Sequence, residues 1–171
     1  MFATQFGVEF DNSLYEWAGL PYGELSVLLS YLKFMLNVHQ THHWQAKDDP
    51  FYGDHKLFQS LYEQVENEID LVAEKAVGLG NVNNVDLTLQ ILQVAKITKN
   101  YYAQLGSTIP SASDLAYKSL QVEQQFLSLI SCVRDSLKAT ATLTYGVDNM
   151  LAGIYDTHES HVYLLKQRCS K

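Results

Sequence analysis

The sequence predicts an all-α fold, a four-helix bundle with a short extra helix between the second and third long helices. Apolar residues recur every three or four positions over four long stretches, which is the spacing of one helix face. Hydrophobic residues make up 47% of the 171 residues and only 3 are proline, which favours long helices around one core. We therefore expect a single bundle domain over residues 23–171, preceded by an N-terminal arm over 1–22.

The first two long helices are indicated by their apolar positions. The first is expected over about 24–46, where the apolar residues step by four, three and four: Leu25, Leu29, Leu32 and Leu36. Lys47 to Pro50, followed by Gly53, breaks the pattern. The second helix is expected from about His55 to Gly78, again with apolar residues on one face. These residues are Phe58, Leu61, Val65, Ile69, Val72 and Ala76.

The rest of the chain is predicted to hold a connector helix and two more long helices. Asp86 can cap a short helix that ends near Ile97, and the stretch 101–110 looks irregular.

Ser111, with Asp114 three residues later, resembles a capping box that opens the third long helix, over about 112–144. Gly146 is its expected terminator, and a last helix is expected over about 148–167.

The charge and composition of the chain limit the classes of partner that it can bind. The chain has 12 Lys and Arg against 19 Asp and Glu, a net charge of −7, which disfavours nucleic acid and anionic membranes as partners and suits metal ions. Two cysteines are too few for a disulfide scaffold. Residues 1–32 contain no Lys or Arg, and no apolar run is long enough to span a membrane. We expect a cytoplasmic protein without a membrane partner.

A polar stripe on the second helix is the strongest functional signal. Its members step by three or four residues: His55, Gln59, Glu63, Glu66, Asp70 and Glu74. Such a stripe is most often a solvated face. Here it starts at a histidine, and His43 lies just across the preceding turn. Imidazole and carboxylate together suit iron, manganese or zinc.

Helix geometry then sets a constraint on any metal site. His55 and Asp70 are 15 residues apart on one helix, which at about 1.5 Å per residue is ~22 Å. A single chain therefore cannot bring both to one ion. An antiparallel, two-fold dimer could, and it would create two equivalent sites.

These residues resemble the signature of the Dps family of mini-ferritins. The matching segments are His43-Trp44, Asp54-His55 and the run from Ile69 to Glu74, with their intervals intact. The resemblance implies a ferritin-like fold and a shell of twelve identical subunits. It also implies ferroxidase sites at dimer interfaces, where His43 and His55 of one chain and Asp70 and Glu74 of its mate bind one or two iron ions, with zinc or manganese as substitutes. Iron(II) would be oxidised by hydrogen peroxide or oxygen and stored as iron(III) mineral.

One departure from the family pattern leaves an alternative open. Many members carry an acid four residues after the second histidine, and this chain has Gln59. An amide binds iron less well than a carboxylate, so one expectation is a weaker second iron position that is completed by Glu63 or water. The other expectation is that Gln59 only forms hydrogen bonds at the interface. The alternative function is a non-catalytic cage with a degenerate site. A ferritin whose site lies inside one bundle needs Glu-x-x-His motifs, and this sequence has none.

The other histidines are expected to have structural roles. His39 should be buried and hydrogen-bonded, and His42 should lie at the surface. His158 and His161 on the last helix could contact a metal, but no acidic spacing singles them out as ligands. Trp44 is interpreted as a packing residue rather than an electron donor.

An acidic iron pore and DNA binding are two further features associated with the family. Asp148, Asp156 and Glu159 are candidates for an acidic iron pore, and equally for a helix cap and solvated acids. DNA binding is expected to be negligible, because the N-terminal stretch lacks the lysines that DNA-binding members use.

Overall fold

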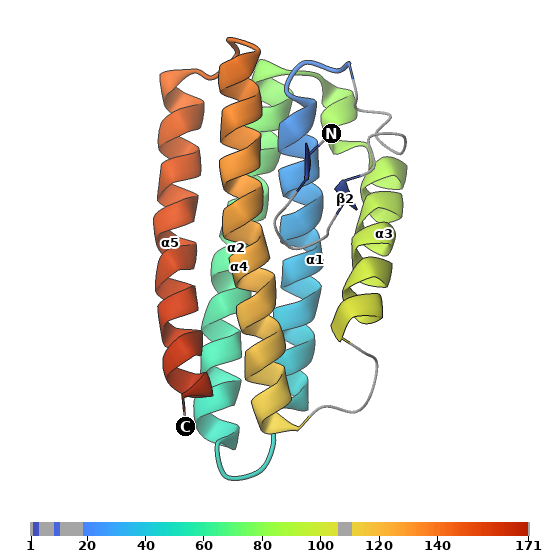
Figure 1. Ribbon diagram of the computed structural model, residues 1–171. Helices are drawn as coiled ribbons and strands as arrows, with labels where there is room; N and C mark the ends of the chain where they lie inside the picture. Colours follow the sequence, from blue (N-terminus) through green and yellow to red (C-terminus); the bar gives the residue numbers. More distant parts are fainter. Residues whose placement is uncertain (1, 4–8, 11–18, 106–110, 171) are drawn as a thin grey trace.

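The computed structural model describes residues 2–3, 9–10, 19–105 and 111–170, and it confirms the all-α fold (Figure 1). The helices are α1 (Gly23–Gln45), α2 (Phe51–Leu79), the 3-10 turn η2 (Val82–Val85), α3 (Leu87–Leu105), α4 (Ala112–Ala139) and α5 (Tyr145–Cys169). Two short antiparallel strands, β1 (Phe2–Ala3) and β2 (Glu9–Phe10), fall within the predicted arm. The rest of the arm before residue 19 lies outside the described residues.

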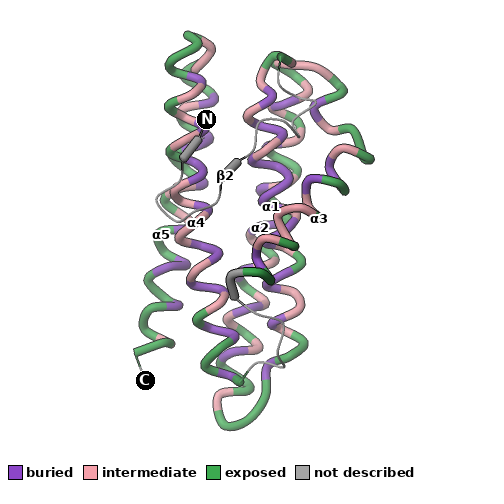
Figure 2. The backbone as a smooth tube through the Cα atoms, turned by 45° about the vertical axis from the view of Figure 1, so that its right-hand side comes forward, coloured by how far each residue is buried: buried purple, intermediate pink, exposed green. Residues whose placement is uncertain are grey.

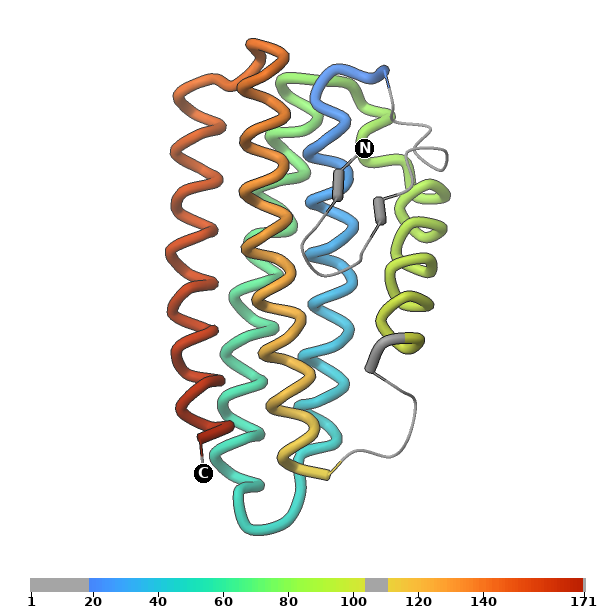
Figure 3. Tube along the Cα trace, in the orientation of Figure 1, coloured from blue at the N-terminus to red at the C-terminus, as the bar shows by residue number. Residues whose placement is uncertain are grey.

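Four of the helices form the bundle, and α3 packs against the outside of α1 (Figures 1 and 3). The antiparallel pair α1 and α2 lies beside the antiparallel pair α4 and α5. In the sequence α3 comes between the two pairs, and it runs alongside α1 toward the end of the bundle where α4 begins. Helices α2 and α4 therefore run in the same direction. A bundle with one long crossover connection of this kind has ferritin-like topology.

The core lies where the apolar stripes predicted it. Leu25, Leu29 and Leu32 of α1 are fully buried, and the inward positions of α2 and α5 join them. Buried residues recur along each long helix (Figure 2). Inside the bundle the Tyr31 ring stacks on Phe126, with ring centroids 5.6 Å apart. Among the described residues, no helix is long and apolar enough to cross a membrane.

The ends of three helices differ from the sequence prediction. Helix α2 begins at Phe51 rather than near residue 55. Helix α3 continues to Leu105 instead of ending near Ile97, so part of the stretch predicted to be irregular is helical. Helix α4 ends at Ala139 rather than at 144, because Ala141 adopts a left-handed conformation with φ of 56°.

The capping predictions had mixed outcomes. The capping box at the start of α4 is confirmed: the Ser111 hydroxyl accepts the Asp114 N–H at 3.2 Å and the Asp114 carboxylate accepts the Ser111 N–H at 2.9 Å. Gly146 does not terminate α4, because it lies in the first turn of α5. That helix is capped by Thr144, whose hydroxyl accepts the Val147 N–H at 3.2 Å.

Candidate functional site

Two histidines predicted as metal ligands meet where α1 ends and α2 begins. The rings of His43 and His55 stack with centroids 3.7 Å apart. His43 Nδ1 donates to the backbone carbonyl of His55 at 2.9 Å, and His55 Nδ1 donates to the carbonyl of His43 at 3.1 Å. A carbonyl oxygen can only accept, so both Nδ1 atoms carry a proton, and Nε2 is the nitrogen of each ring that is left to bind a metal. This is how proteins orient imidazoles that bind metals.

The surroundings of the histidine pair are aromatic and largely open in the single chain. Phe51 stacks on His55 at 5.2 Å, and the Tyr62 ring meets His43 edge-on at 5.3 Å. Trp44 is 67% exposed and Tyr52 is 73% exposed. The interpretation of Trp44 as a packing residue therefore does not hold within the chain. An exposed aromatic surface beside the pair is typical of an interface.

The predicted carboxylate ligands lie elsewhere on α2. Asp70 and Glu74 are exposed, one turn apart, on the outer side of the helix. Their neighbour Glu68 is 3% exposed and points into the bundle. The chain therefore brings the two histidines together but does not bring the two acids to them.

Gln59 is engaged by its own helix. Its amide N–H donates to Glu63 at 2.7 Å, and its oxygen accepts from the Lys56 ammonium at 3.1 Å. The amide oxygen is the one Gln atom able to bind a cation, and here it already faces a positive charge. This arrangement disfavours Gln59 as an iron ligand within the chain.

An ion pair fixes the first turn of α2, next to His55. The Asp54 carboxylate, 1% exposed, accepts two hydrogen bonds from Arg168 of α5, from Nε at 2.6 Å and from the guanidinium terminus at 3.0 Å. Planar two-point pairing of this kind restricts both position and orientation. Arg168 thereby joins the end of α5 to the turn that carries the histidine pair.

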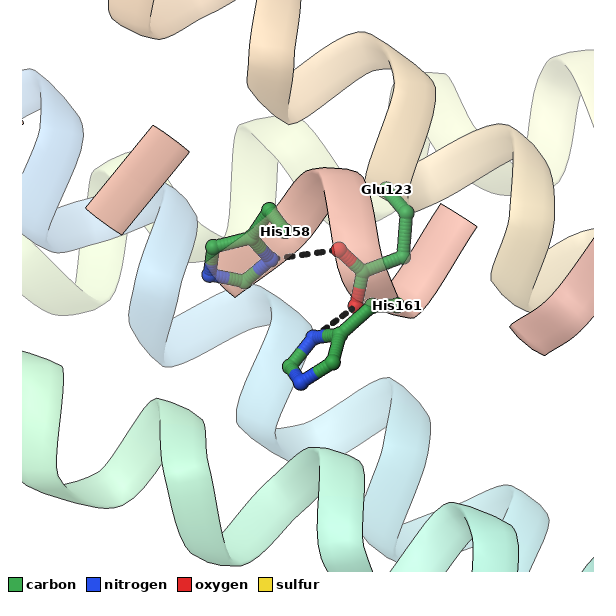
Figure 4. Close-up of side chains that lie close together, drawn as sticks. All are labelled: Glu123, His158 and His161. Atoms are coloured by element: carbon green, nitrogen blue, oxygen red, sulfur yellow. Dashed lines mark hydrogen bonds and ion pairs between the residues drawn. The ribbon is translucent and has the colours of Figure 1, made fainter. Parts of the chain in front are cut away.

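A second group of ligand-type side chains lies inside the bundle, where sequence reasoning placed no site. Among the described residues, Glu123 of α4 and His158 and His161 of α5 each offer a donor atom within 4.8 Å of the others (Figure 4). His158 Nδ1 contacts Glu123, and its Nε2 lies 2.7 Å from Glu68 of α2. His39 Nε2 of α1 donates to Glu123 at 2.9 Å. We call these five residues the bundle cluster; all four bundle helices contribute, and the Glu123, His158 and His161 triad could hold a metal ion.

Charge complementarity stabilises this cluster. Burial lowers the pKa of His158, but the Glu123 charge and hydrogen bonds to Glu123 and Glu68 outweigh burial and raise it to about 9. Burial pushes the pKa of Glu123 upward, yet the charge of His158 and hydrogen bonds from His158, His161 and His39 hold it well below its usual value. His158 is therefore an imidazolium between two carboxylates.

The predictions for the two buried histidines of α1 had different outcomes. His39 is buried and hydrogen-bonded, as predicted, with Nδ1 3.2 Å from the Ser119 hydroxyl. His42 was predicted to lie at the surface, and this was wrong: it is 5% exposed, and its Nδ1 lies 2.7 Å from Ser119. Burial lowers the pKa of His42 to about 3, so the ring is neutral at neutral pH.

The bundle cluster was missed because its members are far apart in sequence. A Glu-x-x-His motif would have indicated a metal site inside the bundle, but α5 has a histidine at both positions, His158 and His161. The acidic members of the cluster, Glu68 and Glu123, lie on other helices. The available signal was weak: both histidines fall on the apolar face that includes Ile154 and Leu165.

Of the three candidate pore acids, one is paired within the chain and two are exposed. Asp148 accepts two hydrogen bonds from Arg134, at 2.7 and 3.3 Å, and does not cap α5. Asp156 and Glu159 are exposed on α5.

Comparisons with known proteins agree with the fold. No protein-family profile matches the chain. It is 27% identical over 128 residues to the nutrient stress-induced DNA-binding protein of Nostoc sp., covering 73% of this chain and 66% of that protein. It is 23% identical over 125 residues to DNA protection during starvation protein 2 of Bacillus anthracis, covering 72% and 79%. The X-ray structure of Dps from Thermosynechococcus elongatus superposes with a TM-score of 0.70 at 16% identity, over 94% of each chain.

Proposed function

Because this chain is a relative of the Dps mini-ferritins, we propose that it oxidises iron(II) at sites shared between two subunits and stores the iron(III) mineral in a hollow shell. The observation that carries this proposal is the reciprocal hydrogen bonding of His43 and His55, which leaves a lone pair on each Nε2. Iron is the substrate, hydrogen peroxide or oxygen the oxidant, and protection from iron-driven oxidative damage the benefit.

The site would be completed by a second copy of the chain. His43 and His55 of one subunit would face Asp70 and Glu74 of an antiparallel mate, as helix length requires. The exposed aromatic residues around the histidine pair, Trp44 and Tyr52 among them, would be covered by that contact. Six such dimers would form a shell of twelve subunits.

The residues have distinct roles in this mechanism. Carboxylates stabilise the charge on iron as it rises from two to three, and neutral imidazoles complete the ligand set. Four protein ligands would leave coordination positions open for the oxidant. With the Gln59 oxygen held by Lys56, a second iron position would depend on Glu63 or water.

The shared site can be tested by complementation. His43→Ala and Asp70→Asn should each abolish rapid peroxide-dependent oxidation of iron(II), measured by the absorbance of the ferric product. In a mixed assembly, a dimer of one chain of each variant has two sites. One site contains both substitutions, and the other contains neither and is intact. Random mixing should therefore restore about a quarter of the wild-type activity.

The outcome distinguishes three arrangements. Asp135→Asn, which removes an exposed acid on α4, should retain full activity and serves as the control. Variants that are inactive alone and remain inactive when mixed would contradict a shared site. Full activity in either single variant would show that iron is not oxidised at the predicted site. Absence of rapid oxidation in the unaltered protein would support the alternative function, a non-catalytic cage with a degenerate site.

The names of both sequence relatives refer to DNA. We propose that this chain does not share that property, because its net charge of −7 opposes phosphate. Protection would then come from removing iron(II) and peroxide rather than from covering the duplex.

A further inference from the structure

We propose that each subunit carries a second metal site inside its own bundle, in which Glu123, His158 and His161 bind a divalent first-row transition metal. Two imidazoles and one carboxylate are the ligands that proteins use for iron(II) with open coordination positions, and also for zinc. The site needs no second subunit, so it does not depend on the interface site proposed above.

The donor atoms are close enough to surround one ion. They lie within 4.8 Å of one another, and His161 Nδ1 is 3.3 Å from Glu123 Oε1. A tetrahedral ion with bonds of about 2.1 Å holds its ligands about 3.4 Å apart. Side-chain adjustments on the order of 1 Å would bring the donors to that spacing, with no movement of the helices.

The backbone already directs the ligands at one point. His158 and His161 are three residues apart on α5, so they share a helix face, and both turn Nδ1 toward the Glu123 carboxylate (Figure 4). The three side chains are almost fully buried, with His161 the most exposed at 8%. Three protein ligands leave at least one coordination position free.

Two neighbouring residues would support these ligands. Glu68 lies 2.7 Å from His158 Nε2 and would keep the proton on that nitrogen, so the metal would take the place of the proton on Nδ1, which is released to solvent. Gln64 in turn donates to Glu68 at 3.2 Å. A carboxylate on the far nitrogen is the usual partner of a metal-bound imidazole, so Glu68 is a positioning residue. His39, which donates to Glu123 Oε1, orients the carboxylate in the same way.

A surface groove reaches the bundle cluster at Glu68. It has a volume of about 380 Å³ between α2 and α5, and its lining includes Glu68, Lys75, Met150 and Thr157. Because Glu68 both lines this groove and contacts His158, an ion entering there meets a carboxylate one contact away from the ligands.

The first experiment uses the unaltered protein in its native assembly. The protein is stripped of metal and crystallised, and the crystals are soaked in zinc(II), or in iron(II) without oxygen. Anomalous scattering at the absorption edge of the metal should place an ion bonded to Glu123, His158 and His161. Soaked crystals with no ion at these residues would overturn the proposal and leave a purely structural hydrogen-bond network.

The second experiment counts metal in variants with cobalt(II), whose absorption bands report nitrogen and oxygen ligands. His161→Gln should lose one bound ion per chain, because the amide keeps a donor for Glu123 but offers no imidazole. His42→Gln changes another buried histidine that contacts Ser119, and it should bind as much cobalt as the wild type. Circular dichroism confirms that each variant is folded.

Stoichiometry also separates this site from the interface site. Asp70→Asn should retain the ion lost in His161→Gln, even if the protein proves unable to oxidise iron. A folded His161→Gln protein that binds as many ions as the wild type, with unchanged cobalt bands, would refute the inference.

Discussion

At the scale of single residues, the role of each histidine follows from the partners of its two ring nitrogens. His43 and His55 donate from Nδ1 to carbonyl oxygens, so Nε2 is the nitrogen left to bind a metal. His158 has a carboxylate on both nitrogens and is positively charged. His42, buried against a hydroxyl, is neutral. The same side chain thus serves as a candidate ligand at the surface, a cation in the core and a neutral packing group.

The ion pair between Asp54 and Arg168 gives a prediction at this scale. Arg168→Met would leave the Asp54 carboxylate, 1% exposed, without its partner, and should lower the free energy of unfolding by about 3 kcal/mol. Arg168→Lys keeps the charge but loses the planar two-point contact, so it should lie in between. Urea unfolding of the folded protein measures both.

Lys166→Met is the matched control, because Lys166 is exposed on the same last turn of α5. It should change the free energy of unfolding by less than about 0.5 kcal/mol. Equal losses in Arg168→Met and Lys166→Met would show that the pair contributes nothing specific.

Sequence reasoning reached some of these residues and not others. The His43 and His55 pair was predictable because only a short turn separates them, so local spacing fixes their proximity. Glu123 and His158 are 35 residues apart on separate helices, and no local pattern links them. Their contact depends on how α4 and α5 pack, which only the folded chain specifies.

At the scale of elements, the end of α2 is tied to the start of α1 through a close approach at Gly80. A Cβ atom there would lie 2.4 Å from the Pro21 carbonyl oxygen and 2.7 Å from the Ala76 carbonyl oxygen. Asn84 occupies the same junction and donates to both oxygens, at 2.8 and 3.1 Å. Only glycine fits at this position.

Substitutions of two glycines near the end of α2 should therefore have opposite effects. Gly80→Ala should destabilise the protein by about 2 kcal/mol or more, because backbone atoms cannot move aside as a side chain would. Gly78→Ala, where nothing lies within 4 Å of the new methyl group, should be neutral or stabilise α2 by up to about 1 kcal/mol. Thermal unfolding compares them; equal shifts in the midpoint would contradict the role assigned to Gly80.

The predicted helix faces were more accurate than the predicted helix ends. Burial enforces the apolar period along a whole helix, so the stripes of α1 and α2 could be read directly. An end depends on a few residues. The end of α4 was placed five residues too late because Ala141, a residue that seldom adopts positive φ, gives no signal of the turn.

At the scale of the whole molecule, net charge dominates the response to other polyelectrolytes. A shell of twelve chains, each of charge −7, would carry −84 before any iron enters. This sum already includes the basic residues near the C-terminus, and one of them, Arg168, is engaged by Asp54 and is less available to phosphate. The particle should attract metal cations and repel phosphate.

We therefore predict that the assembled protein does not retard duplex DNA in a gel shift, even at low salt, where electrostatic attraction would be strongest. A DNA-binding protein with a basic tail, run alongside, should shift under the same conditions. Tight association of this chain with DNA at low salt would show that local positive surface outweighs the net charge.

Helix α2 faces two ways: Glu68 points into the bundle and Asp70, two residues later, points outward. Each residue turns a helix by about 100°. Inserting or deleting one residue between positions 55 and 68 would therefore rotate Glu68 away from the bundle cluster and Asp70 away from its outward position at the same time. The stretch should thus tolerate exchanges of side chain far better than changes in length. An insertion or deletion of one residue in this stretch should therefore disrupt both the bundle cluster and the proposed interface site.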